Sequence, residues 1–255
     1  MSIYESGQKV GRIFHDGSEV ENIYSDGTLI YSAHRDYILN ETVINLDGID
    51  NTGSGHSGTA TVWKNLIDSQ PDATLRFAQW TGNSMISESR TAALTNYVSV
   101  PFVLPPTGDF TIEEVIRMDG VGSTYAPVIC NTTRASGNGA VGFSRRASDG
   151  RLCLLLGTGT ALVSSYTLTL GEIVNCSLVR QNGVFRIYVN GVLKGSVSNA
   201  GQLANQELRI FGGTPSAGDS SHNVVGNVYS LRIHHAAYTA EQLKNNYQVD
   251  KQRYQ

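Results

Sequence analysis

The chain has few charges and few basic residues, and each shortage excludes a class of protein. Asp, Glu, Lys and Arg make up 16% of the 255 residues, below the usual ~25%, which argues against a coiled coil or a charged helical bundle. The net charge of −3 provides no basic field, so nucleic acid is not expected as a partner. The hydrophobic content of 40% is too high for an intrinsically disordered chain.

Cysteines, long apolar runs and an export signal are also scarce or missing. Cys130, Cys153 and Cys176 lie in apolar, strand-like runs without a Cys-x-x-Cys motif, so we expect buried, reduced thiols and folding in a reducing cytosol. No apolar stretch approaches the ~20 residues of a membrane span, so membrane insertion is not expected. The first residues lack the basic region and apolar core of a signal peptide, so we expect no classical secretion.

Residues 1–34 contain a sequence repeat with a spacing of ten residues. Arg12-Ile-Phe-His-Asp-Gly17 returns as Asn22-Ile-Tyr-Ser-Asp-Gly27, and each copy is a strand-like run that ends in Asp-Gly. This pair suits the type I′ turn of a hairpin, because both central residues need a positive φ. The segment therefore predicts a small β-meander of about three strands, which is marginal alone and should pack on something larger.

Residues 35–255 read as a long series of short strands separated by Asp-Gly and Asn-Gly turns. Strands at this spacing predict an all-β sandwich or jelly roll. One helix of about ten residues is expected near the C-terminus. Thr239 and Gln242 fit a capping box, and Leu243 and Tyr247 follow on one helical face that can pack on the sheet.

Several motifs resemble those of a known family. Phe185–Leu193, Val225–Ile233 and Ala237–Tyr247 resemble the closing strands and helix of concanavalin A-like, laminin-G-like (LamG) lectin-fold domains. Leu46–Ser57 and Trp63–Leu66 resemble the opening of such domains in bacteriophage structural proteins, although Asn65 stands where Asp is usual. The tail Asp250-Lys-Gln-Arg-Tyr254 resembles the one that often follows the helix in bacteriophage members of the family. The repeat in residues 1–34 resembles hairpins at the N-termini of phage tail and head appendage proteins.

The resemblance implies a concanavalin A-like jelly-roll β-sandwich with a short C-terminal helix over residues 35–255, preceded by a β-hairpin attachment unit over residues 1–34. It implies a virion structural protein, a head decoration or surface appendage, made in the host cytoplasm and displayed on the virion surface. Its partners would be capsid, collar or tail proteins and host cell-surface carbohydrate, with many copies in each particle. The alternatives are a tail-tip or baseplate receptor-binding protein and a glycan-active enzyme.

Catalysis is not expected, although some relatives of this fold are glucanases. A retaining glycosidase needs two carboxylates about 5–5.5 Å apart on one face. The one Glu pair in a predicted strand is Glu113-Glu114, whose side chains should point to opposite faces. We therefore predict a binding protein and no enzyme.

Four residues are candidates for ligand binding. Trp80 and Tyr125 can stack on the C–H face of a sugar, although a core position is the competing interpretation for each ring. Asp219 and His222 lie in the Gly/Ser-rich loop 212–223, which either rims a ligand groove or is a solvated connection.

Asp47, Asp50 and Asn51 are the candidates for metal binding. These oxygen-bearing side chains can supply part of a Ca²⁺ site, which needs six to eight oxygens. The other interpretation is a structural loop, because Asp and Asn commonly form turns by bonding their own backbone. No other cofactor is expected.

Overall fold

The computed structural model describes six short strands within residues 1–35 and then residues 36–87, 97–121, 125–131, 141–157, 159–211 and 224–255. The chain divides into two compact units, Met1–Tyr37 and Ile38–Gln255. The predicted ligand residues Asp219 and His222 lie outside the described residues. The other predicted site residues belong to the second unit.

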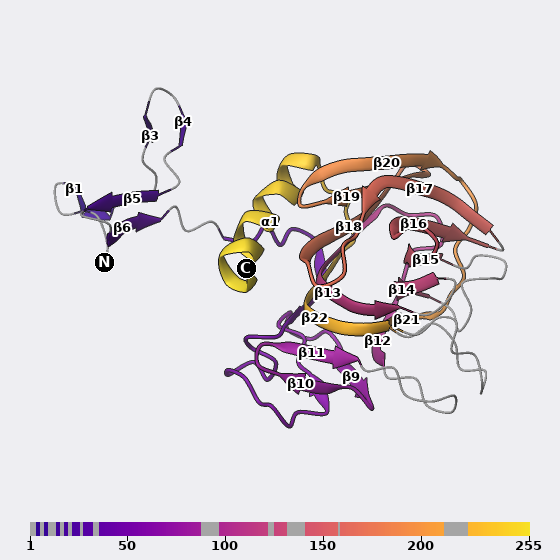
Figure 1. Cartoon of the computed structure of the whole chain (residues 1–255), viewed down its shortest axis with the longest axis horizontal. Helices are drawn as coiled ribbons and strands as arrows, with labels where there is room; N and C mark the ends of the chain where they lie inside the picture. The colour runs from indigo at the N-terminus through magenta and orange to yellow at the C-terminus, as the bar shows by residue number, and fades with distance from the viewer. Residues whose placement is uncertain are drawn as a thin grey trace. The chain divides into compact units, whose positions relative to one another are not determined.

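The first unit contains three antiparallel strand pairs (Figure 1). They join β1 (Tyr4–Glu5) to β2 (Gln8–Lys9), β3 (Phe14–His15) to β4 (Ser18–Glu19), and β5 (Asn22–Ser25) to β6 (Thr28–Ser32). The two Asp-Gly pairs fall between the strands of the second and third pair, as the hairpin prediction requires. The prediction of one three-stranded meander is wrong, because each described strand pairs only with its immediate neighbour in the chain.

The second unit is a sandwich of two eight-stranded sheets whose strand pairs are antiparallel (Figure 1). The sheet that contacts the C-terminal helix α1 (Ala240–Tyr254), called the helix-side sheet, has the order β10-β11-β22-β13-β18-β19-β20, and β7 also pairs with β22. Its strands are β7 (Thr42–Asp47), β10 (Gln79–Thr81), β11 (Ser84–Ser87), β13 (Phe110–Val121), β18 (Ile173–Gln181), β19 (Val184–Val189), β20 (Val192–Ser198) and β22 (Val224–His234).

The other sheet, called the opposite sheet, has the order β17-β16-β15-β14-β21-β12-β9-β8. Its strands are β8 (Val62–Trp63), β9 (Ala73–Arg76), β12 (Tyr97–Val103), β14 (Tyr125–Cys130), β15 (Val141–Arg146), β16 (Arg151–Leu156), β17 (Gly159–Thr167) and β21 (Glu207–Ile210). The predicted all-β sandwich is confirmed. Late strands lie among early ones in both sheets, which brings distant parts of the sequence together.

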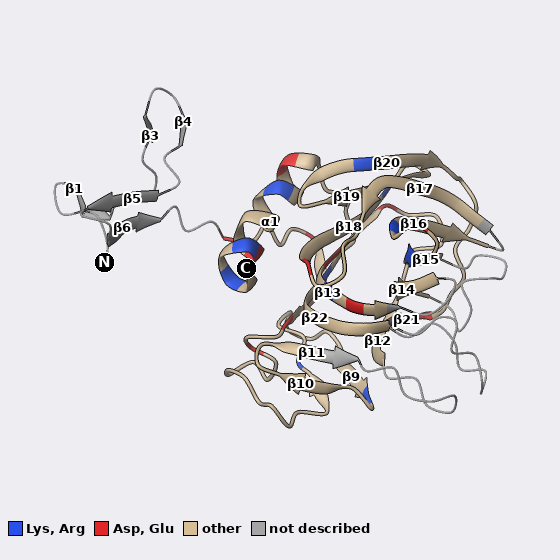
Figure 2. Cartoon of the chain, viewed as in Figure 1, with Lys and Arg blue, Asp and Glu red and all other residues tan. Residues whose placement is uncertain are grey.

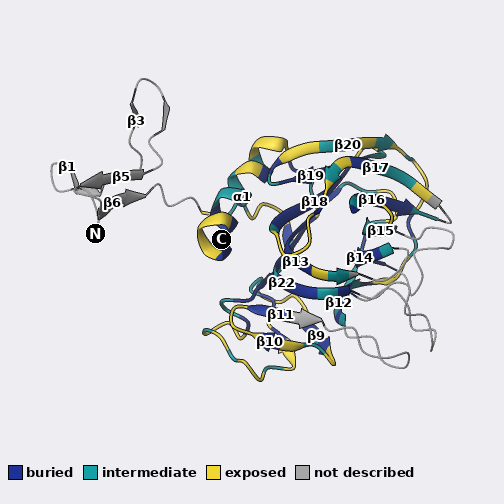
Figure 3. Ribbon diagram, viewed as in Figure 1, coloured by how far each residue is buried: buried dark blue, intermediate teal, exposed yellow. Residues whose placement is uncertain are grey.

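Buried apolar side chains from both sheets form the core of the sandwich. Figure 3 shows that buried residues run along the strands of both sheets. Ile112, Ile116 and Met118 of β13 are each at most 1% exposed, and such burial stabilises the fold by about 1.5–3 kcal/mol for each side chain. Trp63 is fully buried, as predicted, and its Nε1 donates to the Asp47 carbonyl at 3.0 Å. The indole therefore satisfies its polar atom inside the core.

The three cysteines are buried free thiols, as predicted. Cys130 and Cys153 lie in the opposite sheet, and Cys176 lies in β18 of the helix-side sheet. Burial raises the pKa of the Cys153 thiol to about 12. The thiol is therefore protonated near neutral pH and a poor nucleophile.

Helix α1 begins with the predicted capping box. The Gln242 backbone N–H donates to Thr239 Oγ1, and the Thr239 N–H donates to Gln242 Oε1. The helix is longer than predicted, because Val249, Asp250 and Tyr254 remain buried against the sheet beyond the expected end. This one helix in the described part of the chain is not long and apolar enough to cross a membrane.

Candidate functional site

A polar pocket of about 320 Å³ lies where three distant segments of the second unit meet. The segments are the β10–β11 hairpin, the paired strands β13 and β22, and the last turn of α1. The lining residues are Thr81, Asn83, Ser84, Arg117, Asn227, Tyr229, Arg253 and Tyr254. Its volume is near the lower end of the ~300–1,000 Å³ typical of small-molecule pockets.

The strand order of the helix-side sheet creates this pocket. Strand β22 pairs with β11 on one side and with β13 on the other, so the hairpin and the centre of the sheet become neighbours. Arg117 lies directly opposite Asn227 in the ladder, and opposed residues point to the same face. Asn227 Nδ2 donates to Ser84 Oγ at 2.8 Å, and Ser84 Oγ donates to the Thr81 carbonyl at 3.0 Å, which fixes the hairpin to β22.

Gly48, which follows β7, supports the turn of the hairpin. A Cβ atom at this position would lie 2.0 Å from the Asn83 carbonyl oxygen and 2.8 Å from the Tyr229 carbonyl oxygen. The Gly48 N–H donates to that Tyr229 carbonyl at 2.8 Å. Only glycine fits between these backbones, so Gly48 sets the position of Asn83 in the pocket.

Arg117 is held in place by a neighbouring carboxylate. Its Nε and Nη2 donate to the two oxygens of Asp119 at 2.9 Å, and both side chains are 37% exposed. The hydrogen bonds to Asp119 raise the pKa of Arg117, and Tyr229 adds to the rise. The guanidinium therefore stays charged.

The end of α1 closes the pocket by binding β7. The Asp47 carboxylate accepts hydrogen bonds from Tyr254 Oη at 2.7 Å and from Arg253 Nη2. The Tyr254 ring lies 5.6 Å from the Tyr229 ring, measured between centroids. Lys251 and Arg253 make this end of the helix basic, as Figure 2 shows. Charges of this sign suit a helix C-terminus, because they complement its dipole.

Asp47, Asp50 and Asn51, the predicted calcium ligands, bind the protein itself. Asp47 accepts from the Ile49 N–H at 2.8 Å as well as from α1, and Asp50 Oδ1 accepts from the Gly55 N–H at 2.7 Å. The Asn51 amide pairs in both directions with the Ser57 backbone. Within the described ranges, no group of three or more His, Cys, Asp and Glu residues could hold a metal ion. These contacts are those of the structural-loop interpretation, and calcium binding at these three residues stays a prediction.

Trp80 does not form the surface platform that the sequence predicted. Its side chain is 9% exposed, its Nε1 donates to the Ala60 carbonyl at 2.9 Å, and its ring meets Trp63 edge-on at 4.9 Å. The indole is buried because β10 turns it toward the core, where His56 covers another part of the ring at 5.6 Å. Trp80 is therefore a core residue, as the competing interpretation proposed.

Tyr125 is half-buried at the start of β14 in the opposite sheet. Its hydroxyl hydrogen-bonds Thr160 Oγ1 at 2.8 Å. It belongs to the other sheet and is not among the residues that line the pocket. Sugar stacking at Tyr125 stays a prediction, and so does any role of Asp219 and His222.

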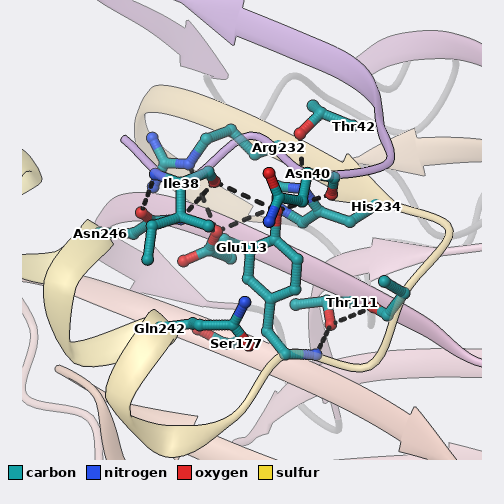
Figure 4. Close-up of polar contacts among 12 residues, drawn as sticks. Ile38, Asn40, Thr42, Thr111, Glu113, Ser177, Arg232, His234, Gln242 and Asn246 are labelled. Atoms are coloured by element: carbon teal, nitrogen blue, oxygen red, sulfur yellow. Dashed lines mark hydrogen bonds and ion pairs between the residues drawn. The ribbon is translucent and has the colours of Figure 1, made fainter. Parts of the chain in front are cut away.

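A second set of polar residues joins α1 to the helix-side sheet through hydrogen bonds and ion pairs (Figure 4). Glu113 Oε1 accepts hydrogen bonds from Asn246 Nδ2 at 2.7 Å and from His234 Nε2 at 3.0 Å, and Arg232 Nε lies 3.5 Å away. His234 Nδ1 in turn accepts from the Thr42 hydroxyl at 2.8 Å. Glu113, Arg232, His234 and Asn246 are at most 1% exposed, so no substrate reaches them.

Asp250 extends this set of contacts from the helix. Its carboxylate accepts from Arg232 Nη1 at 3.0 Å and Nη2 at 2.6 Å, and from Asn175 Nδ2 at 2.6 Å. A bidentate pair of this kind is among the strongest hydrogen-bonded arrangements in proteins. The network therefore fixes α1 to the sheet and, through it, the residues that α1 supplies to the pocket.

The charge states of the network follow from its partners. Burial alone would raise the pKa of Glu113, but Arg232 and the hydrogen bonds from His234 and Asn246 lower it below its usual value. Burial lowers the pKa of His234. Glu113 is therefore ionised and His234 neutral at neutral pH, and Arg232 pairs with the carboxylates of both Glu113 and Asp250.

Glu113 and Glu114 point to opposite faces, as predicted. Glu114 lies opposite Cys176 and Leu231 in the sheet, both of which belong to the apolar core. Neither Glu114 oxygen has a hydrogen-bond partner among the described residues, and burial raises the pKa of this carboxyl well above the usual value. No Asp or Glu is among the eight lining residues of the pocket. The pocket therefore offers hydrogen-bond donors and ring faces, but no carboxylate for acid–base hydrolysis.

The sequence-based search missed the lining residues of this pocket. One signal was available: Asp250, Arg253 and Tyr254 are spaced at i, i+3 and i+4, so a helix puts them on one face. The remaining lining residues are typical of turns and sheet surfaces and carry no motif. Their proximity depends on which strands are neighbours.

Comparison with known proteins shows the family to which this chain belongs. The family model described as the Concanavalin A-like lectin/glucanases superfamily (Laminin_G_3) matches residues 91–244, more than half of the chain. No curated protein sequence matches the chain.

Several solved structures share the fold at low sequence identity. The sialidase of Trypanosoma rangeli in complex with sialic acid is 15% identical with a TM-score of 0.62, and the match covers 91% of this chain and 36% of the sialidase. Domain 4 of AbnA, a GH43 arabinanase from Geobacillus stearothermophilus in complex with arabinotriose, is 15% identical with a TM-score of 0.57 over 82% of this chain and 99% of that domain. The binding domain of botulinum neurotoxin serotype D is 13% identical with a TM-score of 0.61 over 83% of this chain and 52% of that one. The chain thus spans about a third of the sialidase, and at these identities the likeness concerns the fold.

Proposed function

Because the chain belongs to the concanavalin A-like lectin/glucanases superfamily, we propose that it is a non-catalytic carbohydrate-binding protein of a bacteriophage particle. It decorates the head or forms another surface appendage and binds glycans on the host surface. The observation that carries the glycan-binding part of the proposal is the polar pocket at the end of α1 on a lectin-like sandwich.

The pocket has the groups that bind sugars. The amides of Asn83 and Asn227 and the Arg117 guanidinium hydrogen-bond hydroxyl groups, and the Tyr229 ring offers an apolar face to sugar C–H groups. The arabinanase domain and the sialidase named above were solved with arabinotriose and sialic acid. These neighbours support carbohydrate as the ligand class.

A binding role without catalysis is supported by the positions of the acids. The pocket lining contains no carboxylate, Glu113 is locked in the network under α1, and Glu114 lies in the core. A glycosidase needs two carboxylates that reach one substrate bond. Glu113 and Glu114, as the structure describes them, are therefore unsuited to catalyse glycoside hydrolysis.

The virion role is supported by the sequence resemblance and by the division of the chain. Leu46–Ser57, Trp63–Leu66 and the tail from Asp250 resemble phage structural proteins, and the short hairpins of residues 1–34 belong to a unit of their own. In this proposal the hairpins attach the protein to capsid, collar or tail proteins. Many copies on one particle compensate for weak binding at each pocket.

A glycan array tests the binding function. The full-length protein, displayed in many copies on beads, should bind a subset of bacterial surface glycans. Tyr229→Ala should weaken this binding at least tenfold, because stacking and the pocket wall are lost. Tyr97→Ala, which changes a tyrosine of β12 in the opposite sheet, serves as the matched control and should bind normally. If the multivalent wild-type protein binds no glycan, the proposal fails.

Immunogold labelling of intact particles tests the virion function. We expect label on the particle head or on a surface appendage, and we expect a protein that lacks residues 1–37 to fold and yet fail to join particles. Label confined to the tail tip would favour the receptor-binding alternative over decoration. Particles without label would contradict a virion role.

A further inference from the structure

Building on the proposed carbohydrate-binding function, we propose that the pocket selects acidic saccharides, in which a sugar carboxylate binds beside Arg117. Uronic acids are the simplest sugars of this class. Three features of the pocket support this: the charge of its lining, the fixed orientation of Arg117 and the fixed amide of Asn227.

The charged residues of the lining are all basic. Arg117 and Arg253 are its charged members, and their aspartate partners Asp119 and Asp47 are not among the eight lining residues. A ligand in the pocket therefore meets guanidinium groups and no carboxylate. An anionic group gains charge-assisted hydrogen bonds there, which are about twice as strong as neutral ones.

Arg117 is oriented before any ligand binds. Asp119 occupies its Nε and Nη2 side through contacts of 2.9 to 3.2 Å, so the guanidinium plane is fixed beside Tyr229 at the pocket wall. A planar fork held in this way matches the two oxygens of a carboxylate. It loses less conformational entropy on binding than a freely rotating arginine.

Asn227 supplies the second, independent observation. Its side chain is 4% exposed, lines the pocket, and uses its Nδ2 to bind Ser84 Oγ. This bond fixes the orientation of the amide at the pocket wall, and a sugar hydroxyl in the pocket can donate to its Oδ1. The pocket thus combines a carboxylate position at Arg117 with a hydroxyl position at Asn227, which lies directly opposite in the ladder.

The shape of the site fits a sugar ring that carries both hydroxyl groups and a carboxylate. The Tyr229 and Tyr254 rings lie 5.6 Å apart at an interplanar angle of 52°, on the side of the pocket that α1 supplies. Aromatic faces take up the apolar face of a sugar ring, while its polar edge carries the hydroxyls and the carboxylate. The exposed Asn83 and Thr81 provide further contacts at the hairpin.

The test compares acidic oligosaccharides with their neutral methyl esters. An array carries oligomers of glucuronic, galacturonic and mannuronic acid, each beside its methyl ester, with neutral and sulfated oligosaccharides in separate positions. We expect the full-length protein to bind at least one acid form about 10- to 100-fold more tightly than its ester, the range expected for a charge-assisted hydrogen bond.

Arg117→Gln should abolish the difference between acid and ester, and Arg117→Lys should retain part of it because the charge remains. The matched control is Arg146→Gln, which removes another arginine paired with an aspartate, Asp149, on the opposite sheet. This variant should bind like the wild-type protein. Urea unfolding of each variant verifies that the fold is intact.

Equal binding of acid and ester, or an unchanged preference in Arg117→Gln, would overturn the inference. Binding to neutral glycans alone, or a stronger preference for sulfated ones, would also overturn it while leaving the carbohydrate-binding proposal intact. If no glycan of any kind binds, the proposed function itself fails.

Discussion

Glu114 is the residue whose environment is least expected from its chemistry. It is fully buried opposite Cys176 and Leu231, with no hydrogen bond to either carboxyl oxygen. Burial raises its pKa well above the ordinary value of 4.5, so the carboxyl is protonated in the folded protein. An unpartnered polar group in a core costs about 1–3 kcal/mol.

Replacing Glu114 should therefore stabilise the protein. The folded state keeps a proton that the unfolded chain releases above pH 4.5, so this contribution to stability is complete below that pH and is lost as the pH rises toward the raised pKa. We expect Glu114→Leu to raise the free energy of unfolding at pH 7 by about 1–3 kcal/mol. Its advantage over the wild-type protein should grow by up to about 1.4 kcal/mol for each pH unit.

Urea unfolding at pH 5, 6, 7 and 8 measures this difference. Glu114→Gln is the control, because it keeps a polar group and removes the titration. Parallel pH profiles for the wild-type protein and Glu114→Leu would show that Glu114 is not protonated in the core.

Gly48 is a single residue on which the geometry of the pocket depends. Because a Cβ atom there would lie 2.0 Å from the Asn83 carbonyl oxygen, Gly48→Ala must displace the β10–β11 hairpin. We expect a loss of stability of about 1–3 kcal/mol and weaker glycan binding, measured by urea unfolding and by the array. Gly58→Ala is the matched control, because a Cβ atom there meets nothing within 4 Å. If Gly48→Ala bound glycans normally, the hairpin would not be part of the site.

At the scale of elements, helix α1 depends on a buried ion pair. Hydrogen bonds to charged groups contribute about 1.5–3 kcal/mol to stability. We expect Asp250→Ala to lower the free energy of unfolding by about this amount, because Arg232 loses both of its bonds to that carboxylate and retains Glu113 at 3.5 Å. Backbone N–H groups of α1 should also exchange faster with deuterium.

The control for Asp250 is Asp149→Ala, which breaks the exposed pair with Arg146. Pairs of this kind contribute little to stability, so we expect the unfolding free energy to stay nearly unchanged. An Asp250→Ala protein as stable as the control would contradict the role of the buried network.

The local features of these elements could be predicted from sequence. The capping box of Thr239 and Gln242 depends on residues three apart, and the opposite faces of Glu113 and Glu114 depend on strand alternation alone. The core position of Trp63 was also predicted. Asn65, which replaces an Asp in the family pattern, uses its amide both to accept from the Asn45 N–H and to donate to the Val43 carbonyl, and an Asp could not donate.

The pocket could not be predicted, because it depends on strand order. Nothing in the chain indicates that β22 pairs with both β11 and β13, yet this pairing brings Ser84, Arg117 and Asn227 together. Trp80 was misjudged for a related reason: its alternation with polar neighbours does not reveal which face of β10 is covered. Local patterns specify elements, whereas the site is a property of their arrangement.

At the scale of the whole molecule, the sandwich and its helix assemble one pocket, and the central claim is that this pocket binds glycan. Amide chemical shifts recorded by NMR, as the best glycan from the array is titrated into the full-length protein, test it most directly. We expect the largest changes at Thr81, Asn83, Ser84, Arg117 and Asn227, with smaller ones at the end of α1. Changes confined to the opposite sheet around Tyr125, with these amides unmoved, would contradict the account.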